Sequence, residues 1–141
     1  MRAVLTVLSI LVPASAALAE SCSTGFFGPD MCAEAETARV QIAPLLPRQV
    51  ADSLTWQDIA ADGPRLIGTM VWEMPAATLD ARLQAAGKTR ADLADELVGF
   101  TTTIVCGQAA FREFIAAGGM FQFDYRTQDG AAIGSIPLKA C

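Results

Sequence analysis

The sequence predicts a single α+β domain: a mainly antiparallel sheet of about four strands, packed against helices and stapled by disulfides. Three observations support this class. Two pairs of strand-like segments are each joined by a turn signal, at residues 62–64 and 129–130. Segments with helical periodicity lie before and between these pairs. Four cysteines, an even number, complete the pattern.

Residues 1–19 have the organisation of a cleavable secretory signal peptide. Arg2 supplies the positive charge, an apolar run follows over residues 3–12, and small residues lead up to Ala19. The apolar run is too short to span a bilayer, which needs roughly 20 apolar residues. We therefore expect cleavage after Ala19 and a periplasmic protein, with secretion as the other destination.

The first cysteine after this segment raises the question of a lipid anchor. Cys22 follows closely, but the acidic Glu20 lies where a lipoprotein signal has small residues. We expect no lipid anchor. We also expect no transmembrane segment, because no other part of the chain is long and apolar enough.

The rest of the chain is predicted to form a disulfide loop and short helix over residues 20–45, then the α+β domain over residues 46–141. Loss of residues 1–19 from a chain of 141 leaves enough for one domain and too few for two. The chain has 15 acidic and 10 basic residues, and the basic ones are scattered. Nucleic acid is therefore not an expected partner, since phosphate binding needs clustered basic residues.

The cysteines predict two disulfides. An even number of cysteines in an exported protein indicates that they are paired in disulfides. The four cysteines are Cys22, Cys32, Cys106 and Cys141. Three pairings are possible; the most economical joins Cys22 to Cys32 and Cys106 to Cys141. Metal binding and redox catalysis are the alternatives, but both favour close spacing such as Cys-x-x-Cys, which is absent. The chain also has no histidine, so we expect no metal and no cofactor.

The N-terminal half is predicted to contain a loop, a helix and a strand pair. Turn-forming residues fill 22–32, where two phenylalanines could pack onto the domain. Residues 33–42 are good helix formers and are stopped by Pro44. Alternating apolar residues predict a strand over 50–59, and an apolar run predicts a central strand over 66–72. The two strands should form an antiparallel hairpin.

Three helices are predicted next. The first covers 78–86 and has one apolar edge. The second begins at a capping-box-like sequence, 89–92, although the β-branched run 101–105 weakens its end. The third covers 108–117 and stops at a glycine pair.

The chain ends in a predicted hairpin. Aromatic residues alternate with polar ones over 121–125, which indicates a strand with one buried face. The Asp-Gly pair 129–130 favours a tight turn, and 131–138 can return as the partner strand. A bulge near Gly134 would be needed to place both isoleucines of that strand on the same side.

The C-terminal part combines features that recur together. They are Cys106, Phe111-Arg112, Ile115, Gly118-Gly119, Phe121-x-Phe123-x-Tyr125, Asp129-Gly130 and Cys141. This block resembles small exported bacterial proteins of unassigned function. More distantly, it is similar to the type II secretion pilotins of the class with a sheet packed on helices.

The resemblance covers roughly residues 46–141 and implies a Cys106–Cys141 disulfide. It also implies an envelope protein that binds a partner and helps a secretin reach or assemble in the outer membrane. Typical pilotins are lipoproteins, and this chain lacks a lipobox. No binding residue is carried over individually, because the matching residues are those that build the fold.

The sequence gives little support for catalysis. Without histidine, Ser-His-Asp and Cys-His arrangements are excluded. The closest carboxylate groups are Glu34 with Glu36, whose side chains should diverge, and Asp92, Asp95 and Glu96 on the solvated start of a helix. The glycine pair lacks the spacing and lysine of a phosphate loop, and the alternating aromatics are typical of a core. We therefore predict that the protein is not an enzyme.

These observations favour a noncatalytic periplasmic binding or assembly protein. It would present a groove or a sheet edge to an apolar peptide of another envelope protein. The alternative is an exported inhibitor or immunity-type protein whose acidic surface meets a basic enzyme. A continuous apolar groove would favour the first hypothesis, and a protruding acidic loop the second. A pocket of converging carboxylates would indicate an enzyme.

Overall fold

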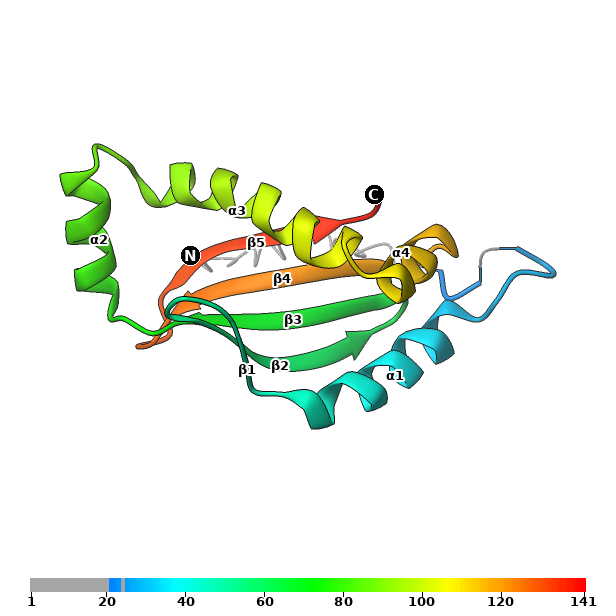
Figure 1. The fold of residues 1–141 in the computed structure, drawn as a ribbon. Helices are drawn as coiled ribbons and strands as arrows, with labels where there is room; N and C mark the ends of the chain where they lie inside the picture. The colour runs from blue at the N-terminus through cyan, green and yellow to red at the C-terminus, as the bar shows by residue number, and fades with distance from the viewer. Residues whose placement is uncertain (1–20, 24) are drawn as a thin grey trace, which may run out of the picture.

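The structure, a computed structural model, describes residues 21–23 and 25–141. The predicted signal peptide, residues 1–19, lies outside this part of the chain. Figure 1 shows the elements. In chain order they are α1 (Met31–Ile42), η1 (Ala43–Leu45), β1 (Arg48–Ala51), β2 (Leu54–Asp62), β3 (Arg65–Trp72), α2 (Ala76–Ala85), α3 (Arg90–Cys106), α4 (Ala109–Ala116), β4 (Met120–Thr127) and β5 (Ala132–Leu138).

The strands form one sheet in the order β1-β2-β3-β4-β5. Every neighbouring pair is antiparallel except β3 and β4, which run parallel because helices α2, α3 and α4 carry the chain back between them. The prediction of a single α+β domain with a mainly antiparallel sheet is confirmed. No helix among the described residues is long and apolar enough to cross a bilayer.

The predicted strand count of about four is wrong by one. The sequence places Val50 in the same strand as Leu54 and Trp56, whereas the structure has a tight turn between them. Ser53 lies in the left-handed region, with a φ of 58°, so the chain reverses and β1 folds back onto β2. A serine with positive φ has no distinctive sequence signal, unlike glycine or asparagine.

Helices α1, α3 and α4 cover one face of the sheet, and α2 stands beyond one end of it (Figure 1). The aromatic residues of β4 face these helices, and Phe121, Phe123 and Tyr125 are at most 1% exposed. The polar residues that alternate with them, among them Asp124 and Arg126, lie on the opposite face. The core therefore sits between the sheet and one layer of helices.

Helix α3 extends through the β-branched run because tertiary contacts outweigh helix propensity. Thr101 and Val105 are buried, and the Thr101 Oγ1 lies 2.8 Å from the Tyr125 hydroxyl. The start of the helix is as predicted: Thr89 and Asp92 form a reciprocal capping box. The helix therefore continues to Cys106.

The predicted C-terminal hairpin and its bulge are confirmed. Tyr125 pairs with Gly134 and Arg126 with Ala132, so Ile133 is the extra residue. This offset buries both isoleucines of β5, which are 8% and 5% exposed. The turn that precedes β5 contains Gly130 with a φ of 84°.

Two disulfides join the ends of the described chain to the domain. Cys22 is bonded to Cys32 in the first turn of α1, and Cys106 at the end of α3 is bonded to Cys141. The loop closed by the first disulfide does not pack as the sequence suggested. Phe26 and Phe27 are 96% and 95% exposed, and their rings contact each other edge to face.

Candidate functional site

A groove runs along helix α1, between it and the corner where α3 meets α4. It consists of two adjoining cavities that share Gln41, Ile42 and Phe111. The first, here called the α4 cavity, has a volume of about 350 Å³, and the second, the α3 cavity, about 530 Å³. We call the two together the α1 groove.

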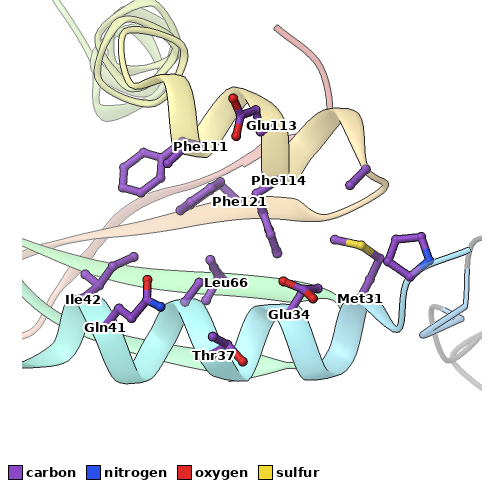
Figure 2. Close-up of a pocket in the computed structure, with 14 residues that line it drawn as sticks. Met31, Glu34, Thr37, Gln41, Ile42, Leu66, Phe111, Glu113, Phe114 and Phe121 are labelled. Carbon is purple, nitrogen blue, oxygen red and sulfur yellow. The ribbon is translucent and has the colours of Figure 1, made fainter.

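The α4 cavity has one polar wall and one aromatic wall. Figure 2 shows Glu34, Thr37 and Gln41 on α1, opposite Phe111 and Phe114 on α4. Between the helices the floor is formed by the sheet residues Leu66 and Phe121, both fully buried. The apolar Met31 and Ile42 of α1 lie at the two ends of this polar wall.

The aromatic wall is supported from beneath. The ring centroid of Phe121 lies 4.8 Å from that of Phe111 and 5.5 Å from that of Phe114. A Cβ on Gly119 would lie 2.3 Å from the Phe114 ring, so only glycine allows this ring position. The amide of Gly119 also donates to the Phe114 carbonyl at 3.0 Å. Gly118 and Gly119 therefore end α4 and shape the groove, rather than forming a phosphate loop.

The α3 cavity continues the groove past the end of α1. Its lining includes Leu45, Val50, Trp56 and Ile104. The Trp56 indole N–H donates to the Asp58 carbonyl at 2.9 Å, so the polar edge of this side chain is already satisfied. An occupant of the cavity would therefore meet mainly apolar surface.

Three charged residues lie along the groove and make no ion pair within the described chain. Glu34 and Glu113 line the α4 cavity, and Arg48 lines the α3 cavity. The four ion pairs of the described residues lie elsewhere: Arg39–Glu36, Arg65–Asp62, Lys88–Glu96 and Arg90–Asp80. The groove is thus acidic at one end and basic at the other.

The first carboxylate pair considered in the sequence does not form a site. Glu34 faces the groove, whereas Glu36 points elsewhere and accepts two hydrogen bonds from Arg39, at 2.5 and 2.8 Å. The hydrogen bond from Arg39 lowers the pKa of Glu36. A carboxylate held ionised in this way is a poor general acid.

The second group of carboxylates has structural roles. Asp92 accepts hydrogen bonds from the backbone and hydroxyl of Thr89, and these lower its pKa. Glu96 pairs with Lys88, and Asp95 is exposed. The expectation that these acids occupy a solvated helix start is therefore correct.

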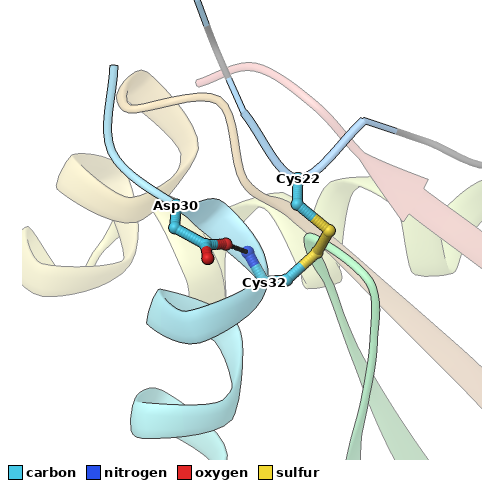
Figure 3. A group of neighbouring side chains, drawn as sticks. All are labelled: Cys22, Asp30 and Cys32. Atoms are coloured by element: carbon cyan, nitrogen blue, oxygen red, sulfur yellow. Dashed lines mark hydrogen bonds between the residues drawn. A yellow bond between two sulfur atoms is a disulfide. The ribbon is translucent and has the colours of Figure 1, made fainter. Parts of the chain in front are cut away.

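Figure 3 shows another cluster with metal-ligand residue types, formed by Cys22, Asp30 and Cys32. Both sulfurs are used in the disulfide. The Asp30 carboxylate accepts hydrogen bonds from the backbone amides of Cys32 and Ala33, at 3.0 and 3.2 Å, and so caps α1. These contacts make the cluster a structural staple at the start of the helix.

The groove could not be predicted from the sequence. The spacing of Phe111 and Phe114 places them on the apolar face of a helix but does not indicate that they lie opposite α1. Nothing in the sequence marks Glu113 and Arg48 as residues of a site, because exposed charged residues are common in any domain. The alanines of α1 are the one sequence feature that indicates a groove, since a helix with small apolar residues leaves space beside it.

No protein-family model and no curated protein matches the sequence. The structure, in contrast, is similar to the pilotin EpsS of the Vibrio vulnificus type 2 secretion system. The two have a TM-score of 0.61 and 17% identity over 78% of this chain and 88% of EpsS. The chain has the pilotin fold.

Two further solved structures support this assignment of the fold. The type II secretion pilotin AspS from Vibrio cholerae has a TM-score of 0.51 and 12% identity, over 77% of this chain and 88% of AspS. A Pseudomonas aeruginosa protein, described only as a candidate secreted protein, has a TM-score of 0.60 and 14% identity. That match covers 78% of this chain and 89% of the other.

Proposed function

We propose that this protein is a noncatalytic accessory factor of the bacterial envelope, and that it binds a segment of another envelope protein in the α1 groove. The observation that carries the proposal is a continuous, apolar-floored groove on a domain with the pilotin fold. The signal-peptide features of residues 1–19 support a periplasmic location. By the pilotin likeness, a secretion component is the first partner to test.

An amphipathic helix fits this groove better than an extended strand. Helix α1 has 12 residues, so the wall it forms is about 18 Å long at 1.5 Å per residue. A bound helix of similar length would place one apolar stripe on the half-buried Phe111, Phe114 and Ile104. The sheet edges are less suitable, because β1 has only four residues and β5 contains Pro137, which has no N–H to donate.

The proposal of a noncatalytic role agrees with the electrostatics of the described residues. The carboxylates with shifted pKa values among them are all shifted downward by hydrogen bonds, and none has the raised pKa of a general acid. Burial raises the pKa of Tyr125, but its hydroxyl is hydrogen-bonded to Thr101 inside the core. The inhibitor alternative is not favoured either, since the loop between Cys22 and Cys32 exposes Phe26 and Phe27, and its one acid, Asp30, caps α1.

The test is affinity capture from the envelope fraction of the producing bacterium, with the oxidised protein lacking residues 1–19 as bait. Gln41→Trp places a large side chain where the two cavities meet, and Val40→Trp, at an exposed position of α1 outside the groove lining, is the matched control. We expect the wild type and the control to retain the same envelope protein and Gln41→Trp to lose it. Equal capture by all three baits would refute the groove as the binding site. A hydrolase that loses activity when captured would support the inhibitor alternative instead.

A further inference from the structure

The charged residues of the α1 groove are ordered along its length. Helix α1 runs from Glu34, in its first turn, toward Arg48, which follows η1. Helix α4 runs the opposite way (Figure 2), and Glu113 on α4 lines the same cavity as Glu34. Two carboxylates therefore flank one end, and a single guanidinium lies at the other.

These three charges have no partner in the described chain, although other acids and bases of the domain do form ion pairs. Glu36, two residues from Glu34 on the same helix, is paired with Arg39. Glu34, Glu113 and Arg48 are exposed and border an apolar floor. An occupant that covers this floor brings its own side chains close to these charges, where opposite charges attract and like charges repel.

We propose that the α1 groove selects an amphipathic helix by its charge order, with basic residues between Glu34 and Glu113 and an acidic residue at Arg48. This inference rests on the proposed function, since it specifies the occupant of the same groove. The charge order also determines in which direction the bound helix lies along the groove. Stable helices carry acids in the first turn and bases in the last, because these charges complement the helix dipole. Such a helix would bind with its C-terminal end at Glu34, antiparallel to α1.

The probes are three synthetic helical peptides of about 18 residues with the same apolar stripe. The last two turns carry two lysines in the first peptide, two glutamines in the second and two glutamates in the third. Dissociation constants are measured by fluorescence anisotropy at low salt. We expect the lysine peptide to bind about three- to tenfold more tightly than the glutamine peptide, and the glutamate peptide to bind most weakly. The differences should shrink at high salt because exposed charges are screened.

The matching protein variant is Glu34→Lys/Glu113→Lys, which should reverse the order of the three peptides. The control is Asp52→Lys/Asp95→Lys, which changes the net charge equally at exposed positions outside the groove and should keep the wild-type order. Circular dichroism establishes that both variants are folded. A control that reverses the order would mean that net charge decides, and the inference would be wrong.

The peptides separate this inference from the proposed function. If none of the three peptides binds the wild type, the groove is not a helix site, and both ideas fall. If all three peptides bind within twofold of one another, the groove accepts helices but does not read charge, and only this inference is refuted. A dimer of the protein that every peptide displaces equally would also refute it, because the groove would then be filled by a second copy.

Discussion

The glycine at the end of α4 is predicted to control the stability of the aromatic wall. In Gly119→Ala, the new Cβ would lie 2.3, 2.5 and 2.7 Å from three carbons of the Phe114 ring, far inside contact distance. The ring must move off Phe121, with which it makes an edge-to-face contact. Overpacking of this kind costs about 1–3 kcal/mol of unfolding free energy.

A double-mutant cycle isolates the clash. Phe114→Ala alone should destabilise the domain, because the half-buried ring is lost. In that background, the three closest atoms that the new Cβ of Gly119→Ala would meet are gone, and its cost should fall to within about 0.5 kcal/mol of zero. Unfolding in urea, with both disulfides intact, gives the four free energies.

Gly99→Ala is the matched control, since a Cβ at this helical position meets nothing within 4 Å. It should leave stability unchanged or raise it by up to about 1 kcal/mol, because alanine is the better helix former. The reasoning fails if Gly119→Ala is as costly in the Phe114→Ala background as in the wild type. It also fails if Gly119→Ala and Gly99→Ala are equivalent, since the Phe114 ring would then yield without cost.

Three further predictions use the same assay. Phe26→Ser/Phe27→Ser should change the unfolding free energy by less than about 0.5 kcal/mol, because both rings are almost fully exposed; a larger loss would mean that they pack on the domain. Replacing Cys106–Cys141 by serines should cost about 1 kcal/mol more than replacing Cys22–Cys32, since their sequence separations are 35 and 10; the reverse order would contradict the loop-entropy argument. Hydrogen bonds from Thr127 and from the Ala76 amide lower the pKa of Asp129, so its stabilising effect is present above the ordinary carboxyl pKa and disappears as pH falls through the lowered value. Asp129→Asn should therefore flatten the loss of stability below about pH 4, and an unchanged acid profile would refute this assignment.

The features that the sequence predicted well depend on local patterns. The alternation of Phe121, Phe123 and Tyr125 with polar residues defines a strand with one buried face, whatever lies on top of it. The bulge at Ile133 followed from the opposite parity of two isoleucines that both had to be buried. The capping box at Thr89 is likewise contained within four residues. In each case the controlling interaction is short in sequence.

The features that the sequence predicted only weakly or not at all depend on contacts between distant segments. Helix α3 continues through its β-branched run because Thr101 meets Tyr125, a contact across 24 positions of the chain. The groove arises because α1 and α4 lie apart on the sheet, and no local pattern specifies that separation. The divergence of Glu34 and Glu36 was predicted from their spacing on one helix, but that Glu113 lines the same cavity as Glu34 depends on how α4 lies across from α1.

The Cys106–Cys141 disulfide is positioned to hold one wall of the groove. Cys106 is the last residue of α3, directly before Gly107 and Gln108 in the lining of the α3 cavity, and Cys141 follows β5. The strands already hold one another through continuous ladders, whereas α1 and the α3–α4 corner are joined across the groove by few contacts of their own. A wall fixed in this way loses less conformational entropy when a helix enters the groove, so the Cys106–Cys141 disulfide would contribute to affinity as well as to stability. Reduction should therefore weaken binding of the lysine peptide at denaturant concentrations where the sheet is still folded.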